Sequence, residues 1–482
     1  MAAGEPLALS EAVQARIDAA RALVESIVRK GVRAYGVNTG VGALCDVVIA
    51  APKQEQLSRN IVMSHAVGVG LPLEPAAVRA IIAAAINNFS HGFSGVRRAV
   101  TGGLLAMLDF DCVPEVPALG SVGYLSHMAH IALVLIGEGR ALSRGRWVSG
   151  AEALESMRLA PLVLRAKEGL SLVNGTPCAT GLSALALTRT ERLLDAADVV
   201  AAMTFENLHG QLAVFDADAL RLRVSDGVRR VGERLRAALS GSAILEQSAG
   251  RRIQDPLSLR AVPQVHGAAR DLFTRAAQVV DDELASVTDN PVLVGTVDEP
   301  RALSGANAVG AALGLCADAL GVAVAEVAAM SERRVDRLVN PLVSHLPAFL
   351  SADEGARSGF MIAQYTAVSL VAENRRLAAP ASLDGGVTSG LQEDHLSHAT
   401  PAALKLLKII DNAEAILAIE LLAAAQAYDL QREPQTRAPY TDAVYRWLRA
   451  RIARYDDDRP LGADIQSARR LLGEPLPDLG GA

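Results

Sequence analysis

The sequence predicts an all-α protein, and three observations support this fold class. Half of the 482 residues (50%) belong to the apolar set AVILMFWYC, so the chain can bury a large core. Aromatic residues make up only 4% of the chain, and the apolar half consists mainly of alanine, leucine and valine. Alanine and leucine are strong helix formers, whereas β-rich proteins usually carry more aromatic and β-branched residues. Alternation of apolar and polar residues, the pattern of strands, is nearly absent.

Helices are predicted in order along the chain from apolar residues at helical spacing. The first begins after Ser10, a suitable N-cap, and ends at Gly31, which suits the position after a helix. The same spacing predicts further helices over residues 75–108, 178–208, 264–288, 307–337, 357–378 and 401–430. Several of these are long, which favours parallel packing in an extended bundle.

Charge and hydropathy exclude two classes of partner. The formal net charge is −6, from 47 Lys and Arg against 53 Asp and Glu, and no basic run of the kind that binds phosphate backbones is present. We therefore expect no nucleic-acid partner. The most apolar windows, residues 183–203 and 307–330, are interrupted by charged residues, so we expect buried helices and no membrane span.

The N-terminus and the cysteines indicate the compartment. The first residues lack a basic segment followed by an apolar stretch, so they do not resemble a signal peptide. Four scattered cysteines show no metal-ligand spacing, namely Cys45, Cys112, Cys178 and Cys316. Isolated thiols in a large chain indicate a reducing environment. We therefore predict a cytoplasmic protein without a metal site.

Short polar, glycine-rich segments lie between the predicted helices, and function tends to reside in such loops. They are Tyr35-Gly36-Val37-Asn38-Thr39-Gly40, Gly120-Ser121-Val122-Gly123, Asn174-Gly175-Thr176-Pro177, Gln254-Asp255-Pro256, Ser304-Gly305-Ala306-Asn307 and Gln392-Glu393-Asp394-His395. The second segment is not a dinucleotide-binding fingerprint, because no strand precedes it. Residue patterns alone therefore indicate a helical enzyme or binding protein with polar inter-helix loops.

These loops, in this order, resemble the histidine and aromatic amino acid ammonia-lyase family. Further matching segments are Gly92-Phe93-Ser94-Gly95-Val96-Arg97-Arg98, Leu172-Val173-Asn174-Gly175-Thr176, Thr288-Asp289-Asn290-Pro291, Ser331-Glu332-Arg333-Arg334 and Gly359-Phe360-Met361-Ile362-Ala363-Gln364. The resemblance implies a histidase-like fold, with a smaller N-terminal active-site lobe over residues 1–200 and a long central and C-terminal helix bundle over residues 201–482. It also implies a homotetramer whose active sites are shared between subunits.

The resemblance further implies which residues bind and convert a small-molecule amino acid. Tyr35 is implied to be the catalytic base that removes the β-proton of the substrate. Arg260 is implied to hold the carboxylate, while Asn174 and Asn307 flank the amine and carboxylate region.

Three further positions concern the side chain of the substrate. His65 and Glu393 match the positions that bind an imidazole in histidine-type members of the family. Gln392 either lines the site or orients Glu393. The pair Ser64-His65 is the histidine-type form of the selectivity dipeptide, whereas phenylalanine-type enzymes carry apolar residues there.

One segment departs from the family pattern. Family members carry an Ala-Ser-Gly tripeptide, which cyclises into a methylidene-imidazolone electrophile. Here the flanks align but the tripeptide is missing, since the chain reads Gly120-Ser121-Val122-Gly123-Tyr124-Leu125-Ser126-His127-Met128-Ala129-His130. Tyr124 falls where the family has Asp. We therefore expect that the methylidene-imidazolone group is absent and that the protein has no cofactor.

This departure leads to a specific hypothesis about the reaction. A plain α-amino group is a poor leaving group without the electrophile, whereas a trimethylammonium group leaves as neutral trimethylamine. Tyr124 would face that cation, because aromatic rings attract quaternary ammonium by about 0.5–2 kcal/mol. Leu257 and Ala308 replace aromatic residues of the family and widen the space near the substrate nitrogen. The combination resembles ergothionases and predicts a carbon–nitrogen lyase that releases trimethylamine from ergothioneine or a related histidine betaine.

Two alternatives remain open at this stage. In the first, the chain is a non-catalytic, ligand-binding relative that kept the fold. In the second, it is a lyase, isomerase or cyclase that acts on another activated amino acid derivative. Retention of Tyr35, Asn174 and Arg260 argues against the first alternative. A carrier-linked substrate would lack the free carboxylate that Arg260 is expected to bind. The residues do not distinguish ergothioneine from other imidazole betaines.

Overall fold

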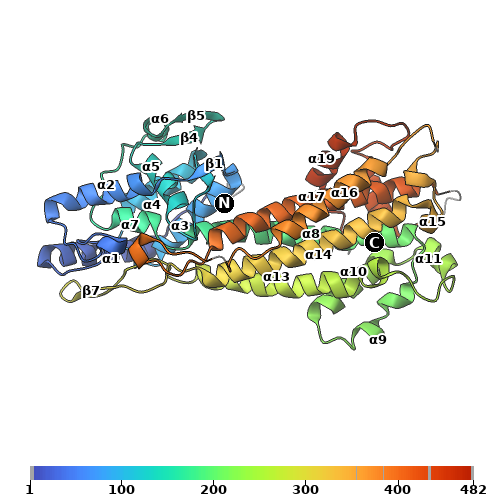
Figure 1. Cartoon of the computed structure of the whole chain (residues 1–482), viewed down its shortest axis with the longest axis horizontal. Helices are drawn as coiled ribbons and strands as arrows, with labels where there is room; N and C mark the ends of the chain where they lie inside the picture. Colours follow the sequence, from blue (N-terminus) through green and yellow to red (C-terminus); the bar gives the residue numbers. More distant parts are fainter. Residues whose placement is uncertain (1–4, 354, 384, 432–435, 479–482) are drawn as a thin grey trace. The chain divides into compact units, whose positions relative to one another are not determined.

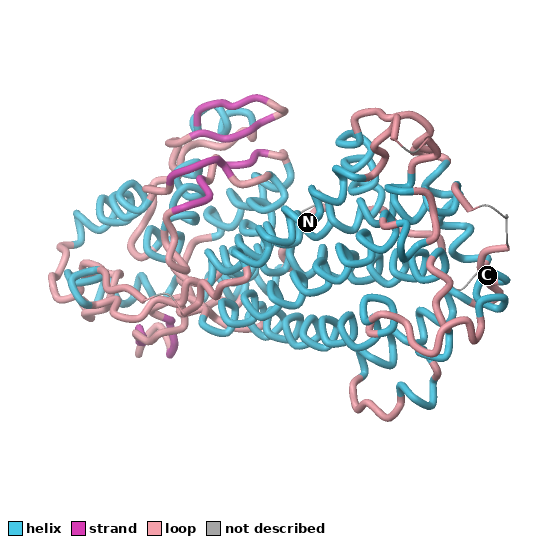
Figure 2. The backbone as a smooth tube through the Cα atoms, turned by 45° about the vertical axis from the view of Figure 1, so that its right-hand side comes forward, coloured by secondary structure: helices cyan, strands magenta, loops and turns pink. Residues whose placement is uncertain are grey.

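The fold is that of a mostly helical protein. The structure is a computed structural model and describes residues 5–353, 355–383, 385–431 and 436–478. Helices prevail and strands are short, as Figure 2 shows, so the predicted all-α fold class is confirmed.

Two compact units make up the chain, and each is discontinuous in sequence. The first comprises Met1–Ala186, Ala277–Asp318 and Pro380–Leu404, and the second comprises Leu187–Ala276, Ala319–Ala379 and Lys405–Ala482. The first unit therefore includes residues 277–318 and 380–404, which the division at residue 200 had assigned to the bundle. That division itself stays a prediction.

The helices of the first unit are labelled in Figure 1. Its helices are α1 (Glu11–Lys30), α2 (Gln54–His65), α3 (Pro75–Ser90), α4 (Arg98–Asp109), α5 (Ser126–Leu135), α6 (Gly150–Ser156) and α7 (Glu168–Val173). Its strands are β1 (Val69–Pro72), β2 (Cys112–Pro114), β3 (Pro117–Leu119), β4 (Arg140–Ser143), β5 (Arg146–Ser149), β6 (Val292–Gly295) and β7 (Pro300–Leu303). They form three small antiparallel sheets, with strand orders β1-β3, β2-β4-β5 and β6-β7.

Four long helices contribute residues to both units. They are α8 (Pro177–Asn207), α13 (Val262–Leu284), α14 (Ala311–Val339) and α17 (Ala399–Asp429). The second unit adds α9 (Ala217–Leu220), α10 (Asp226–Leu239), α11 (Ala243–Ser248), α12 (Leu257–Arg260), α15 (Pro341–Ser344), α16 (Met361–Leu377), α18 (Pro439–Arg449) and α19 (Leu461–Leu472). Short 3-10 turns lie at Gly42–Leu44, Ala51–Lys53, Leu212–Phe215, Ala348–Leu350 and Ser389–Leu391.

The capping residues that the sequence predicts for α1 are confirmed. The Ser10 hydroxyl oxygen accepts a hydrogen bond from the Val13 backbone N–H at 3.4 Å. Gly31 follows the helix in the left-handed conformation, with φ 65°. Its backbone N–H donates hydrogen bonds to the carbonyl oxygens of Ile27 and Val28, in the last turn of the helix, where carbonyl groups otherwise lack partners.

The predicted helix over residues 75–108 is wrong as a single element. It is interrupted between α3 and α4, where Gly92 and Gly95 have φ of 80° and 73°. Both glycines lie close to other parts of the first unit. A Cβ on Gly92 would lie 2.8 Å from the Cβ of Arg16, and one on Gly95 would lie 2.4 Å from Leu293. The break is therefore set by tertiary contacts that the helical periodicity does not record.

Two helical stretches among the described residues, Glu168–Asn207 and Ala311–Val339, are long and apolar enough to cross a membrane, judged by length and composition alone. An apolar 18-residue segment in each is 83% and 56% buried within the structure, respectively. Buried helices of this kind are common in the cores of soluble proteins, so the finding is weak support for a membrane span.

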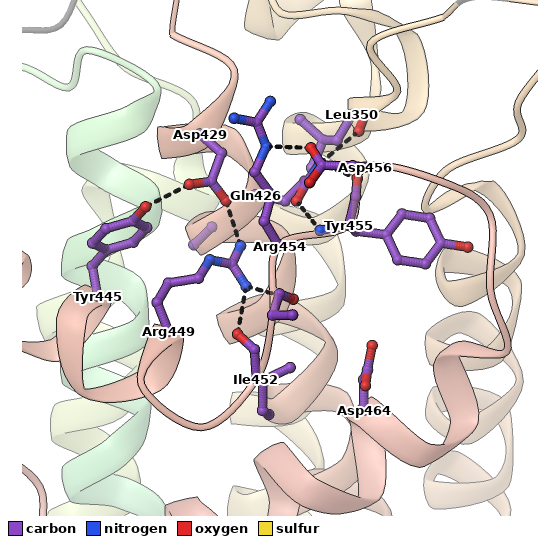
Figure 3. Close-up of polar contacts among 12 residues, drawn as sticks. Leu350, Gln426, Asp429, Tyr445, Arg449, Ile452, Arg454, Tyr455, Asp456 and Asp464 are labelled. Atoms are coloured by element: carbon purple, nitrogen blue, oxygen red, sulfur yellow. Dashed lines mark hydrogen bonds and ion pairs between the residues drawn. The ribbon is translucent and has the colours of Figure 1, made fainter.

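Buried ion pairs connect the long helices of the second unit. Arg334 on α14 donates to both carboxylate oxygens of Glu420 on α17, at 2.6 and 2.9 Å, and both side chains are fully buried. Figure 3 shows a second contact of α17, where Asp429 accepts hydrogen bonds from Tyr445 at 2.5 Å and from Arg449 at 2.6 Å. These contacts join α17 to α14 and to α18.

The small helix α7 lies in the core of the first unit, where all its residues are buried. It packs against α2 so closely that a Cβ on Gly169 would lie 2.1 Å from the Ser58 carbonyl oxygen. It also supports the loop that follows α1, since Gly36, with φ 62°, lies against Leu170. The position of α7 thus determines the positions of two neighbouring segments.

Replacing Gly169 with alanine is expected to destabilise the protein, because the added methyl group overlaps backbone atoms that cannot rotate away. We expect the free energy of unfolding to fall by about 1–3 kcal/mol in chemical denaturation. Gly102→Ala on α4 is the matched control, because its Cβ meets nothing within 4 Å. Alanine there is favoured over glycine by about 0.5–1 kcal/mol. Equal stability of Gly169→Ala and the wild type would contradict the close packing.

Candidate functional site

A cavity of about 730 Å³ lies in the first unit and is lined by loops and helix ends. Six of the eight predicted site residues line it, namely Tyr35, His65, Tyr124, Asn174, Gln392 and Glu393. They come from segments that are far apart in the chain, so the fold brings together most of the predicted site residues.

Tyr35 lies in a loop whose residues on either side in sequence are buried in the core. Ala34 and Val37 are buried in a cluster with α1, and Asn38 closes the loop by accepting from the Ala34 backbone N–H at 2.9 Å. The Tyr35 hydroxyl oxygen accepts a hydrogen bond from the Gly42 backbone N–H at 3.1 Å. Burial raises the pKa of Tyr35, the Gly42 N–H lowers it, and the nearby Glu393 raises it further.

Tyr124 and Glu393 meet inside the cavity, although 269 positions separate them in sequence. The Tyr124 hydroxyl donates a hydrogen bond of 2.5 Å to Glu393 Oε2, and the tyrosine is largely buried. Burial is the main cause of the raised pKa of Tyr124, and the hydrogen bond to Glu393 adds to it. The phenol is therefore a neutral donor to the carboxylate at neutral pH.

The backbone on either side holds this pair in place. Glu393 forms an isolated antiparallel bridge with Thr388, whose backbone N–H donates to the Glu393 carbonyl oxygen at 2.8 Å. On the other side, Leu125 has φ 78° and ψ −81°, a conformation that residues with a Cβ rarely adopt. Its backbone N–H donates to the Val173 carbonyl oxygen at 3.0 Å.

His65 is the last residue of α2 and lines the cavity. Its Nδ1 lies 3.1 Å from the Ser64 hydroxyl oxygen. Burial lowers the pKa of His65, so the imidazole is neutral at neutral pH. The following Gly68 donates its backbone N–H to Nε2 of His130 at 3.0 Å, and burial also lowers the pKa of His130.

Asn174 caps the C-terminal end of α7 and is mostly buried. Its side-chain amide donates a hydrogen bond of 2.7 Å to the backbone carbonyl oxygen of Asn290. Gln392 is an exposed residue of the loop that carries Glu393. Asn174 is therefore held rigidly, whereas Gln392 lies at the edge of the cavity.

Two predicted site residues are not part of this cavity. Asn307 is exposed and does not line it, although its neighbours Ala306 and Ala308 do. Arg260 is the last residue of α12 in the second unit, where its guanidinium faces the Gln254 side chain. The cavity of the first unit, taken by itself, thus lacks the residue predicted to bind a carboxylate.

The structure adds six lining residues with polar or thiol side chains to which the sequence analysis gave no role, namely Cys45, Asn290, Ser304, Ser389, Asp394 and His395. Asn290 and Asp394 lie in segments that resemble the family, and this resemblance is the sequence signal that points to them as site residues. Among the described residues that line the cavity, Glu393 and Asp394 are acidic and none is Lys or Arg. The cavity is therefore suited to a ligand that carries positive charge.

No group of three or more His, Cys, Asp or Glu residues that could hold a metal ion occurs within the described part of the chain. Long helices and a loop-lined polar cavity that holds a tyrosine, a histidine and a glutamate are the features expected of the helical carbon–nitrogen lyases that the sequence segments resemble.

Comparisons with known proteins identify the family. Residues 1–450 match the family described as aromatic amino acid lyase. A histidine ammonia-lyase of Symbiobacterium thermophilum is 44% identical over 472 residues, which cover 97% of this chain and 92% of the relative. The chain belongs to the aromatic amino acid lyase family, whose members are ammonia-lyases that act on small-molecule amino acids.

Solved structures agree with this assignment. The histidine ammonia-lyase of Trypanosoma cruzi has a TM-score of 0.90 and 36% identity, covering 98% of this chain and 89% of that one. An ergothioneine-degrading ergothionase of Treponema denticola, solved with desmethyl-ergothioneine sulfonic acid, has a TM-score of 0.90 and 27% identity. It covers 98% of this chain and 95% of its own. The histidase-like fold that the resemblance implies is confirmed.

The comparisons contradict the prediction that the protein has no cofactor. Relatives that match nearly the whole chain are histidine ammonia-lyases, and their family uses the methylidene-imidazolone group. The prediction rested on one short segment. That segment itself does not fit the Ala-Ser-Gly chemistry, because it reads Gly123-Tyr124-Leu125 and the Tyr124 hydroxyl is bonded to Glu393. The chemical steps proposed below therefore involve only side chains of this chain.

Acidification is expected to destabilise the first unit, because burial lowers the pKa values of His65, His127 and His130. In the unfolded chain these groups titrate near 6.5 and bind protons that the folded unit excludes. Their stabilising effect is therefore complete above about pH 6.5 and is lost as the pH falls through the lower folded values. We expect the urea midpoint to fall between about pH 7 and pH 5.

The variant His130→Gln tests the origin of this effect. Its amide oxygen keeps an acceptor for the Gly68 N–H but cannot be protonated in this range. We expect a smaller loss of stability on acidification than in the wild type. An identical loss in both proteins would exclude His130 as a contributor.

Proposed function

We propose that the protein is a carbon–nitrogen lyase that acts on an imidazole-bearing amino acid derivative. The best candidate reaction is the release of trimethylamine from ergothioneine or a related histidine betaine. The observation that carries this proposal is the acidic cavity that combines Tyr35, His65 and Glu393 without a lysine or arginine among its described lining residues. A substrate with a permanent positive charge complements such a cavity. Likeness to an ergothionase structure supports the same substrate class.

Glu393 and His65 are proposed to bind the imidazole ring. Because Tyr124 donates to Oε2 of Glu393, the other oxygen remains to accept a hydrogen bond from an imidazole N–H. The Tyr124 ring is proposed to face the trimethylammonium group. Attraction between an aromatic ring and a quaternary ammonium contributes about 0.5–2 kcal/mol. The acidic residues Glu393 and Asp394 add favourable Coulomb energy in the cavity.

Tyr35 is proposed to be the base of the elimination. Its phenolate takes the β-proton, the electrons of the Cβ–H bond form the new double bond to Cα, and the Cα–N bond breaks. Trimethylamine leaves as a neutral molecule that keeps the electron pair of that bond. Because burial and Glu393 raise the pKa of Tyr35, the phenolate needs a nearby cation, which the substrate itself supplies.

Arg260 is proposed to bind the substrate carboxylate from another copy of the chain in a homotetramer. This proposal explains why the cavity, taken within one unit, has no cation for a carboxylate. Asn174 and Asn307 are proposed to flank the nitrogen and the carboxylate. The predicted cytoplasmic location stays a prediction.

A second candidate function is the deamination of histidine itself. It is favoured by the relatives that match nearly the whole chain, which are histidine ammonia-lyases. Both candidates use an imidazole-binding cavity and a tyrosine base, and they differ in the amine that leaves. The nature of the released amine therefore separates them.

Purified protein incubated with ergothioneine is expected to release trimethylamine, together with the corresponding unsaturated acid. Gas chromatography of the amine and ultraviolet absorption of the acid measure the two products. Tyr35→Phe is expected to lower kcat by about 10²–10⁴-fold, because a general base contributes that much to a proton transfer. Release of ammonia from histidine, with no trimethylamine from ergothioneine, would identify the second candidate instead.

Two further outcomes of this experiment are informative. Binding of ergothioneine or histidine without any product would indicate a non-catalytic relative. Arg260→Ala is expected to raise KM strongly if the substrate has a free carboxylate, since a bidentate charged contact is lost. An unchanged KM in this variant would indicate a substrate without that group.

The rate is expected to increase with pH, because the base acts only when it is ionised and its pKa is raised. The rate rises because a higher pH increases the phenolate fraction of Tyr35. We expect kcat/KM to rise by about tenfold per pH unit above neutrality, up to the raised pKa of Tyr35 in the free enzyme. His65 adds little to this rise, because its lowered pKa leaves it neutral throughout. A flat profile from about pH 7 to pH 9 would exclude Tyr35 as the base.

A further inference from the structure

A fully buried ion pair lies in the first unit close to the cavity but outside its lining. The Lys167 ammonium donates to Oδ2 of Asp289 at 3.0 Å, and both side chains have no exposed surface. The ammonium also donates to the Ser171 hydroxyl oxygen at 2.8 Å. Neither partner lines the cavity, so the pair has no direct access to a substrate.

Asp289 is linked to the cavity through the next residue. Its Oδ1 accepts a hydrogen bond of 2.7 Å from the Asn290 backbone N–H. The Asn290 backbone carbonyl oxygen accepts from the Asn174 side chain at 2.7 Å. The Asn290 side-chain oxygen accepts from the Gly305 backbone N–H at 2.8 Å. Asn290 thus joins Asn174 to the loop at Ser304–Val309. Both Asn174 and this loop contribute to the cavity lining.

These contacts form a closed ring. Lys167 precedes α7 and Asn174 follows it, so the short helix connects the ion pair with the side chain that bonds Asn290. The ring therefore runs from Lys167 along α7 to Asn174, across to Asn290, and back through Asp289. A closed ring of this kind fixes the orientation of Asn174 relative to Asn290 more strictly than a single hydrogen bond would.

Stability alone does not account for this pair. Removing two charges from water costs more than a simple salt bridge returns, and apolar residues of similar volume often give equal or greater stability. Lys167 also adopts the left-handed conformation, with φ 70°, which is unfavourable for a residue with a Cβ. Two unfavourable features at one residue, which begins the helix whose C-cap lines the cavity, indicate that the residue specifies a geometry.

We propose that Lys167, Asp289 and Asn290 are positioning residues, which fix Asn174 and the Ser304–Val309 loop in the arrangement that binds substrate. The proposal rests on the proposed function of the cavity as a substrate site. None of the three residues takes part in a chemical step. They act through Asn174 and through the loop that contains Ala306 and Ala308.

The first test replaces the ion pair with apolar residues, in the variant Lys167→Met/Asp289→Leu of the full chain. We expect amide hydrogen exchange in peptides that cover residues 172–176 and 304–309 to become at least tenfold faster. The free energy of unfolding is expected to stay equal or to increase, because no unpaired charge remains. Unchanged exchange in both peptides would overturn the proposal, and it does so without reference to any ligand.

The second test keeps the ion pair and changes Asn290. In Asn290→Leu the acceptor for the Gly305 N–H is lost, whereas Asn290→Asp keeps an acceptor oxygen. We expect faster exchange at residues 304–309 in the first variant and near-normal exchange in the second. Asn87→Leu is the matched control, since Asn87 donates a comparable hydrogen bond to the Leu284 carbonyl oxygen away from the cavity lining.

Ligand affinity provides the functional readout, with ergothioneine and histidine as probes in isothermal titration calorimetry. For whichever probe the wild type binds, Asn290→Leu is expected to weaken binding at least tenfold, and Asn290→Asp and Asn87→Leu by less than threefold. Equal weakening in Asn290→Leu and Asn87→Leu would assign Asn290 a merely structural role. If the wild type binds neither probe, the proposed function fails while hydrogen exchange still decides the positioning role.

Discussion

Burial of charged groups is the constraint on which this structure depends. Each unit contains an ion pair with no exposed surface, Lys167–Asp289 in the first and Arg334–Glu420 in the second. An ion left without its partner there would cost several kcal/mol. In the second unit, Glu420 accepts from Arg334 and also from Ser331 and Thr204, which leaves neither carboxylate oxygen without a donor. This set of four hydrogen bonds to Glu420 forms in only one alignment of its helices. It therefore fixes the relative position of α14 and α17, which apolar contacts between alanine and leucine leave less defined.

The same constraint explains the character of the cavity. Tyr35, Tyr124 and Glu393 influence one another electrostatically, and an ionised Tyr35 would add a second negative charge beside Glu393. No lysine or arginine among the described lining residues compensates that charge. A cationic ligand lowers the free energy of the ionised state more than that of the neutral state. The cavity therefore favours ionisation of Tyr35, the proposed base, when a positively charged ligand is bound.

Much of the fold could be predicted from the sequence because helices are local structures. The caps at Ser10 and Gly31 and the periodicity of the long helices require only neighbouring residues. The break at Gly92 and Gly95 could not be predicted in this way, because it depends on contacts with α1 and with β6. The strands were missed for a related reason. Each has three or four residues, which is too few to establish an alternating pattern.

The site was less predictable from residue patterns than the fold. Spacing identified polar loops, but only the family resemblance gave Tyr35, His65 and Glu393 their expected roles. Their presence in one cavity depends on tertiary structure, as does the contact of Tyr124 with Glu393. Arg260 lies in the other unit, so no cavity within one unit reveals its partner groups. The prediction about the cofactor was wrong because one segment was weighed more heavily than the similarity of the whole chain.

The conformation of Leu125 links the shortened segment to the arrangement of the site. A residue with a Cβ at φ 78° and ψ −81° carries strain of about 1–3 kcal/mol, which persists only where the surroundings determine it. Here the surroundings are the hydrogen bond to Val173 just before Asn174, and the contact of Tyr124 with Glu393. Relaxing Leu125 would reorient the backbone that carries Tyr124 and break the 2.5 Å contact. The strain is therefore offset by a partly buried, charge-assisted hydrogen bond, and the position of Tyr124 in the cavity depends on both.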